Sequence, residues 1–260
     1  MLLLIDAGNT RVKWALPDEQ AVPDTRLSAW LRMESLAHDA LDTVLADWQT
    51  LPVSRVLISN VAGDVVQQAI EQRLAQAFPA LSPVRFRSTA CVAGMENHYR
   101  FPEKLGSDRF ATAIGARALY PQQELLIATC GTATTVDIVS SAGHFEGGMI
   151  LPGLKLMAES LAKQTAQLPQ VAESIQVSQP FADNTDQAIV SGCIHAQTGA
   201  ILQALQAREQ QTGQPVRCLI SGGAAPYLLP HLQGKAEAIP SLVLTGLRVV
   251  AQSHPELFQQ

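Results

Sequence analysis

The sequence lacks clustered cysteines. Cys91, Cys130, Cys193 and Cys218 are far apart, with no CxxC pair and no Cys/His pair at the spacing of metal ligands. This absence argues against a zinc motif and against a disulfide framework. Reduced and mostly buried thiols are expected instead, which favours a cytoplasmic protein.

Runs of Lys and Arg are absent as well, and the formal net charge is −5 over 260 residues. The sequence therefore offers no electrostatic reason to bind nucleic acid or an anionic membrane. Its N-terminal apolar stretch is too short for a signal sequence, and no window is expected to span a membrane. Aromatic residues make up only 5%, whereas hydrophobic residues reach 47%, so a large aliphatic core is expected.

The first sixteen residues contain the most informative pattern. Apolar residues 2–5 lead to Asp6, residues 7–10 form a turn, and a second apolar-rich run spans 12–16. This pattern predicts a β-hairpin. Glycine in the turn lets backbone N–H groups approach a phosphate, and Asp6 could hold Mg²⁺ directly or through water. An ordinary hairpin without a ligand is the alternative.

A similar pattern recurs half a chain later. LLLIDAGNTRVKW at 2–14 and LLIATCGTATTVD at 125–137 align Gly8 with Gly131 and Asn9 with Thr132. The repeat suggests two related domains, each contributing a hairpin to a shared cleft, although chance similarity between two glycine hairpins is the alternative. A third glycine-rich segment, ISGGAAP at 220–226, follows a predicted strand and could lie against an adenosine.

The remaining elements indicate an α/β fold. Helical patterns are predicted at 33–48, 64–78, 107–119 and 185–211, and strands at 56–60, 125–129, 133–139, 145–151 and 216–221. At 99–109, the segment YRFPEKLGSDR places Ser107 where it could cap the third of these helices. Alternatively, Asp108 could accept a proton from a substrate hydroxyl while Arg109 and Tyr99 bind the substrate.

Four motifs together resemble type III pantothenate kinases, the family that includes the Bvg accessory factors. They are DAGNT at 6–10, YxxPxxLGxDR at 99–109, GTATTxD at 131–137 and GGxIxPG at 147–153. The resemblance implies two related actin-like (ribonuclease H-like) domains with mixed sheets flanked by helices and an ATP cleft between them, expected at 1–117 and 118–260. It also implies phosphorylation of pantothenate by ATP with Mg²⁺, in a homodimer.

The resemblance assigns roles to individual residues. Asp108 would be the catalytic base. Substrate binding would involve Tyr99, Gly106, Ser107, Asp108, Arg109 and, from the neighbouring subunit, Thr185. Thr185 could equally be a helix N-cap. ATP phosphates would be bound by Asp6, Ala7, Gly8, Asn9, Thr10, Arg11, Val12, Lys13, Gly131 and Thr132.

Thr129 departs from the family pattern. The family usually has Asp at this position, where it helps to bind K⁺ or NH₄⁺, and a neutral hydroxyl contributes much less to such a site. Dependence on a monovalent cation is therefore doubtful. Asp137 could help to hold Mg²⁺ or could simply face solvent. An actin-like nucleotide-binding regulator that acts through a partner is the alternative function.

Overall fold

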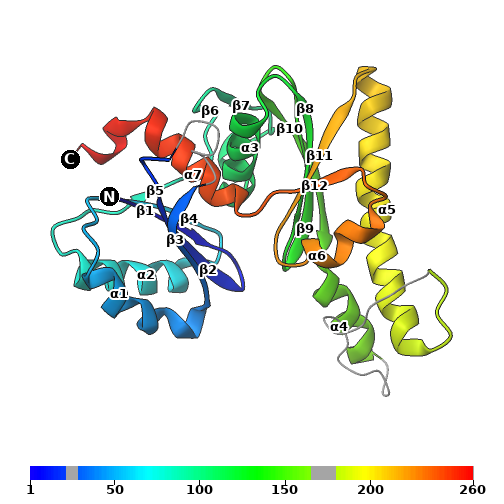
Figure 1. Ribbon diagram of the computed structural model, residues 1–260, viewed down its shortest axis with the longest axis horizontal. Coiled ribbons are helices and arrows are strands. Elements are labelled where there is room, and N and C mark those ends of the chain that lie inside the picture. The colour runs from blue at the N-terminus through cyan, green and yellow to red at the C-terminus, as the bar shows by residue number, and fades with distance from the viewer. Residues whose placement is uncertain (22–28, 165–179, 260) are drawn as a thin grey trace. The chain divides into compact units, whose positions relative to one another are not determined.

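The protein consists of two compact α/β units, as a computed structural model that describes residues 1–21, 29–164 and 180–259 shows (Figure 1). The first unit contains residues 1–121, 143–145 and 242–260, and the second contains residues 122–142 and 146–241. The predicted mixed α/β class is confirmed. The division at residues 117 and 118 stays a prediction, and the C-terminal segment packs with the first unit.

The first unit is built on a five-stranded sheet. Its order is β3 (Trp30–Ala37), β2 (Arg11–Pro17), β1 (Leu2–Ala7), β4 (Arg55–Asn60) and β5 (Val84–Arg85). The pairs β1–β2 and β2–β3 are antiparallel, whereas β4 runs parallel to both β1 and β5. Trp14 and Trp48 meet edge to face at 6.1 Å in its core, between the sheet and the helices α1 (Leu45–Gln49) and α2 (Asp64–Ala77).

Helices α3 (Ser107–Leu119) and α7 (Leu242–Ser253) cross closely in the same unit. A Cβ at Gly115 would lie 2.6 Å from the Leu242 carbonyl oxygen, and a Cβ at Gly246 would overlap the Ala111 carbonyl. These two glycines allow the backbones to touch. The contact fixes α3, whose first turn carries Asp108.

The second unit contains the strand order β12 (Ala236–Ala238), β11 (Val216–Ser221), β8 (Glu124–Cys130), β9 (Ala133–Val139) and β10 (His144–Pro152). His144 and Phe145, which begin β10, belong to the first unit and pair in parallel with Glu96 and Asn97 of β7 (Met95–Asn97). A short strand, β6 (Cys91–Val92), pairs antiparallel with β7.

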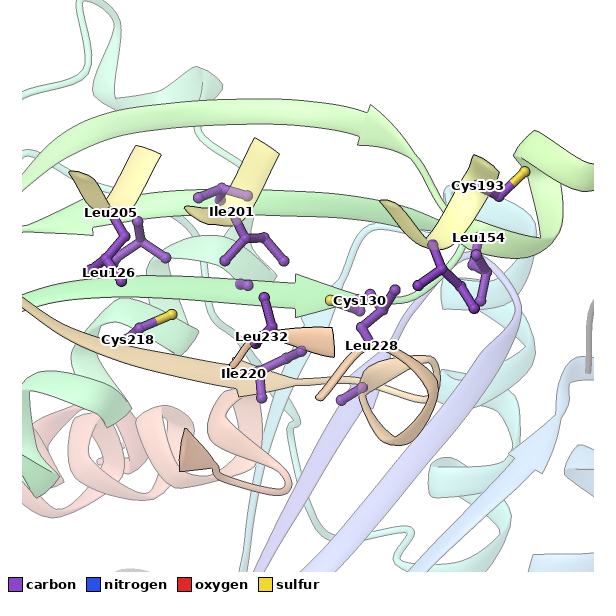
Figure 2. Packing of buried hydrophobic residues seen from close by; sticks show 14 of the residues in the cluster. Leu126, Cys130, Leu154, Cys193, Ile201, Leu205, Cys218, Ile220, Leu228 and Leu232 are labelled. Carbon is purple, nitrogen blue, oxygen red and sulfur yellow. The ribbon is translucent and has the colours of Figure 1, made fainter. Parts of the chain in front are cut away.

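Helix α5 (Thr185–Thr212) supplies much of the second unit's core. Ile201 and Leu205 project toward Leu126 of β8, and Cys218 and Ile220 of β11 lie nearby (Figure 2). The other α-helices that the structure describes in this unit are α4 (Leu154–Gln164) and α6 (Ala225–Leu228). As expected, the four cysteines are unpaired, and three of them are buried.

The repeated hairpins predicted from sequence are present. Strand β1 has β2 as its antiparallel neighbour and β4 as its parallel neighbour, and β8 is related in the same way to β9 and β11. Each turn is closed by its glycine, since the Gly8 N–H donates to the Arg11 carbonyl at 3.0 Å and the Gly131 N–H donates to the Ala133 carbonyl at 2.9 Å, but the first turn is one residue longer.

The predicted helix at 33–48 is wrong over its first part. Residues 30–37 form β3, residues 38–44 form a 3₁₀ helix, and only residues 45–49 are α-helical. Strand β3 pairs with the otherwise open edge of β2 over its whole length. Tertiary hydrogen bonding therefore overrides the local helical pattern.

The expectation that no segment could span a membrane also needs correction. By length and composition alone, α5 is apolar enough to cross one. Core helices of water-soluble domains pass the same test, and α5 buries Val190, Cys193, Ile194, Ile201 and Leu205 within the second unit. Packing accounts for its apolar character.

Candidate active site

The β1–β2 hairpin is held in place by its neighbours. Arg11 donates from Nε to the Ser35 hydroxyl at 2.8 Å and from Nη2 to the Ser35 carbonyl at 2.7 Å. His38 Nε2 lies 2.9 Å from the Gly8 carbonyl oxygen. Asn9 and Thr10 at the tip are exposed, whereas Val12 is completely buried. The hairpin therefore leaves its tip exposed while Arg11 anchors it to β3.

Asp6 is nearly buried at the carboxyl end of β1, beside Lys13 of β2 and Ser59 of β4. Burial raises the pKa of Asp6 to about 7, Lys13 opposes this rise, and the charge of Asp108 adds to it. Two carboxyl groups thus influence each other electrostatically inside the first unit. A divalent cation would relieve both desolvation and repulsion there, so the donors suit Mg²⁺.

Ser107 connects α3 to the sheet. Its hydroxyl lies 2.8 Å from the Ser59 hydroxyl in a buried hydrogen bond, and it makes no N-cap bond. The predicted capping role is therefore wrong. The bond joins the end of β4 to the start of α3 and so fixes the turn that carries Asp108.

Asp108 is oriented by its own helix. Its Oδ1 accepts a hydrogen bond of 2.8 Å from the Arg109 N–H, and burial raises its pKa against the opposing effects of that bond and of the Arg109 charge. Gly106 leaves room for the carboxylate, since a Cβ there would lie 2.6 Å from Asp108 Oδ1. A carboxylate whose pKa is raised binds a proton more readily, which suits it to act as a base.

Arg109 is largely buried beside two aromatic rings. Its guanidinium carbon lies 5.8 Å from the Tyr99 ring centre and 5.6 Å from that of Phe145, and these two rings meet edge to face at 6.2 Å. The structure thus brings together the predicted Tyr99 and Arg109. Phe145 was missed because nothing near it in the sequence marks it as part of this cluster.

The segment before Tyr99 depends on Asn97, which sequence reasoning also missed. The buried Asn97 amide donates to the Thr89 and Pro102 carbonyls at 3.1 Å each, and its oxygen accepts from the Tyr99 N–H at 3.1 Å. A polar side chain with three backbone partners fixes a loop more firmly than apolar packing does. Asn97 therefore positions Tyr99.

The β8–β9 hairpin in the second unit is fixed mainly by close backbone contacts. The Gly153 N–H donates to the Thr132 carbonyl at 2.9 Å, and the Ala224 N–H donates to the Cys130 carbonyl at 3.0 Å. Any Cβ at Gly153 or Gly222 would overlap this hairpin's backbone. Both Gly131 and Thr132 remain exposed, and the 220–226 segment lies against the same turn.

Buried polar side chains hydrogen-bond this hairpin to α5 and to the end of β10. The Thr134 hydroxyl donates to Gln197 Oε1 at 2.7 Å, and Gln197 Nε2 donates to the Pro152 carbonyl at 2.9 Å. Asp137 is 1% exposed, so a solvent-facing role for it is wrong. Gln197 on α5 thus connects the second hairpin to the start of α4.

Thr129 and Thr135 are cross-strand partners just behind the second turn. Both hydroxyl oxygens are buried and have no hydrogen-bond partner among the residues that the structure describes. Unsatisfied buried oxygens are unfavourable unless water or a cation binds them. Two neutral oxygens fit a weak monovalent cation better than a tightly held one.

Thr185 is the first residue of α5 and is exposed. The N-cap is Asn184, whose side chain accepts from the Gln187 N–H at 3.0 Å. The alternative role of Thr185 as a helix cap is therefore wrong, which leaves its hydroxyl outside the helix-capping contacts.

Comparison with solved structures defines the class of fold. A Campylobacter jejuni structure described as a conserved Baf family transcriptional activator has a TM-score of 0.63 and 16% identity, covering 98% of this chain and 99% of that chain. A Sinorhizobium meliloti structure described as a 2-dehydro-3-deoxygalactonokinase has a TM-score of 0.56 and 14% identity, covering 97% and 98%. The chain therefore shares the mixed α/β fold of these two structures.

Sequence comparison narrows the class to one family. The model of type III pantothenate kinase matches residues 2–207. A type III pantothenate kinase of Janthinobacterium is 50% identical over 258 residues, with 98% of each chain covered, and one of Burkholderia mallei is 42% identical over 265 residues, with 97% and 100% covered. The chain belongs to the type III pantothenate kinase family.

Proposed function

We propose that this protein transfers the γ-phosphoryl group of ATP to pantothenate, giving 4′-phosphopantothenate and ADP, the first step towards coenzyme A. The observation that carries the proposal is the electrostatic interaction of two carboxylates: Asp6, which is buried at the end of β1 beside β4, and Asp108, which is half-buried at the start of α3. One carboxylate can bind the Mg²⁺ that accompanies ATP, while the other accepts the proton of the attacking hydroxyl.

Asp108 is proposed as the base. It removes the proton of the primary hydroxyl as that oxygen attacks the γ-phosphorus in line with the departing ADP oxygen. Its raised pKa and its fixed orientation on the Arg109 N–H support this role. Mg²⁺, held by Asp6 directly or through water, would neutralise charge on the phosphate oxygens.

The polyphosphate is assigned to the two hairpin turns. At the first turn, Ala7, Gly8, Asn9 and Thr10 offer backbone and tip groups, Val12 can contribute only its backbone, and Lys13 lies beside Asp6. Arg11 is already bonded to Ser35, so it acts there by holding the turn. Gly131 and Thr132 are assigned the same task at the second turn.

Pantothenate is assigned to Tyr99, Arg109 and residues 106–108. Pantothenate carries one carboxylate, and a guanidinium held beside aromatic rings is pre-organised to pair with such a group. Desolvation within this cluster strengthens the pairing.

We also propose a homodimer in which Thr185 completes the neighbouring substrate site. The second unit exposes large apolar side chains on β10 and α4 and just before α5, which a second copy could cover; they are Met149, Ile150, Leu156, Leu161 and Phe181. Light scattering tests this arrangement.

The protein is further proposed to be cytoplasmic and to bind neither nucleic acid nor membrane. It is also proposed to bind K⁺ or NH₄⁺ only weakly, through Thr129.

The decisive experiment incubates purified protein with ATP, Mg²⁺ and pantothenate, with K⁺, NH₄⁺ or neither, and follows phosphopantothenate by mass spectrometry. Product should form, and Asp108→Asn should abolish turnover while ATP binding persists. Asp64→Asn is the matched control, because Asp64 is an exposed carboxylate in the first turn of another helix. Absence of product under every condition, with ATP still bound, would favour the nucleotide-binding regulator instead.

A further inference from the structure

Three potential metal ligands meet on the outer side of the β7–β10 pair. Glu96 and His144 are directly opposed in the parallel pairing, and His98 follows Glu96 by two residues. Glu96 Oε2 lies 3.3 Å from His98 Nε2 and 3.5 Å from His144 Nε2, and the three ligand atoms lie within 4.8 Å of one another. All three residues belong to the first unit.

These distances suit a tetrahedral transition-metal ion. Two ligand atoms bound to Zn²⁺ at 2.0–2.1 Å with tetrahedral angles are about 3.3 Å apart. Both Glu96–His distances therefore already match, and a small rotation of the imidazoles would bring the two nitrogens together. The two imidazoles are stacked with ring centres 4.3 Å apart, so they already share one side of the pair.

The ligand types select the metal class. Two imidazoles and one carboxylate favour Zn²⁺, Co²⁺ or Ni²⁺, whereas Mg²⁺ prefers oxygen ligands alone. Glu96 is exposed and His144 is partly exposed, so an ion can reach the site and water can occupy its remaining position. The cluster is also separate from the carboxylates Asp6 and Asp108, since it uses neither.

We infer that Glu96, His98 and His144 form a site for a divalent transition metal of the zinc class, which ties the segment before Tyr99 to the start of β10. Residues 99 and 145 directly follow two of the ligands, and their rings meet each other beside Arg109. The metal therefore holds these two segments together next to the rings of Tyr99 and Phe145. It takes no part in phosphoryl transfer.

The test uses untagged protein stripped of metal with a chelator and then titrated with Zn²⁺ by calorimetry. Wild-type protein should bind one equivalent and melt a few degrees higher with Zn²⁺ present. Each of His98→Gln, His144→Gln and Glu96→Gln should weaken binding about tenfold or more and lose the thermal shift. Excess Mg²⁺ should not compete, and Co²⁺ should give a visible absorption band that the variants lack.

His231→Gln is the matched control, because the His231 ring centre lies 5.6 Å from that of a second histidine, His195, and within the described parts of the chain this pair belongs to no three-ligand group. It should bind Zn²⁺ like the wild type. Circular dichroism verifies that each variant folds. No Zn²⁺ binding by folded wild type, or equal binding by the wild type and the three ligand variants, would overturn the inference.

Discussion

Asp6→Asn should stabilise the metal-free protein at alkaline pH while destroying its response to Mg²⁺ and ATP. The pKa of Asp6 rises from 3.8 to about 7 on folding, chiefly through burial. The folded state therefore binds the Asp6 proton more tightly than the unfolded state does. The free energy of unfolding consequently falls as pH rises from about 4 to about 7, and it stays lower by the same amount above that range.

The magnitude follows from the same two values. At about 1.4 kcal/mol per pH unit, the difference between 3.8 and about 7 corresponds to about 4 kcal/mol at pH 8. This figure is an upper bound, since the buried carboxylate can relax or admit water. Asparagine has nearly the same shape and no charge, so the variant avoids this cost. A change of 1 kcal/mol shifts the melting temperature of such a protein by about 2–4 °C.

Thermal melts of wild type, Asp6→Asn and the exposed control Asp39→Asn, recorded between pH 4.5 and 8.5 without divalent ions, measure the effect. The difference in melting temperature between Asp6→Asn and wild type should be small at pH 4.5 and grow to several degrees at pH 8. Addition of Mg²⁺ and ATP at pH 8 should stabilise wild type much more than Asp6→Asn. A gap that is independent of pH would refute the burial argument.

Three further predictions concern space and charge at the start of α3 and around the second hairpin. Gly106→Ala should lower kcat by about 10²-fold with little change in melting temperature, because the new Cβ displaces only the Asp108 carboxylate. A fall in melting temperature large enough to account for the lost activity would argue against this. Thr129→Asp should make initial rates depend strongly on K⁺ compared with Na⁺, since it adds a charge beside the unsatisfied Thr135 oxygen; an unchanged K⁺ response would exclude a cation there. Gly153→Ala should weaken ATP binding in calorimetry by forcing the 131–132 backbone to shift. Gly192→Ala should leave ATP binding unchanged, because a Cβ there meets no atom of the described residues within 4 Å.

Local sequence patterns predicted the parts of the fold whose hydrogen bonds are local. Both hairpins, α2, α3 and α5 are present because their apolar periodicity and glycine turns are visible within short windows. The strand β3 was missed because its stability comes from pairing with β2, which no window of residues 33–48 reveals. Strands β6, β7 and β12, of two or three residues each, are too short to leave a periodic signal.

The same limit applies to the site. Asp6, Asp108, Tyr99 and Arg109 stand in recognisable motifs; in the structure Asp6 feels the charge of Asp108, and Tyr99 lies beside Arg109. Sequence patterns did not reveal Ser59, Phe145 and Gln197, because each contacts a partner far away in the sequence: Ser59 contacts Ser107, Phe145 contacts Arg109 and Gln197 contacts Thr134, at separations of 48, 36 and 63 residues. Asn97 binds nearby backbone, but a single Asn in a loop has no distinguishing pattern.

The two hairpins share a topology but are held by different means, and this difference has consequences for how each tolerates change. Side chains secure the first turn, through Arg11 to Ser35 and through His38 to the Gly8 carbonyl. Backbone contacts that only glycine permits secure the second, at Gly153 and Gly222. Side-chain contacts can be exchanged for others at modest cost, whereas an added Cβ at a backbone contact moves the chain. The first turn therefore tolerates substitution better than the second, and it lies beside the carboxylates to which the chemistry is assigned.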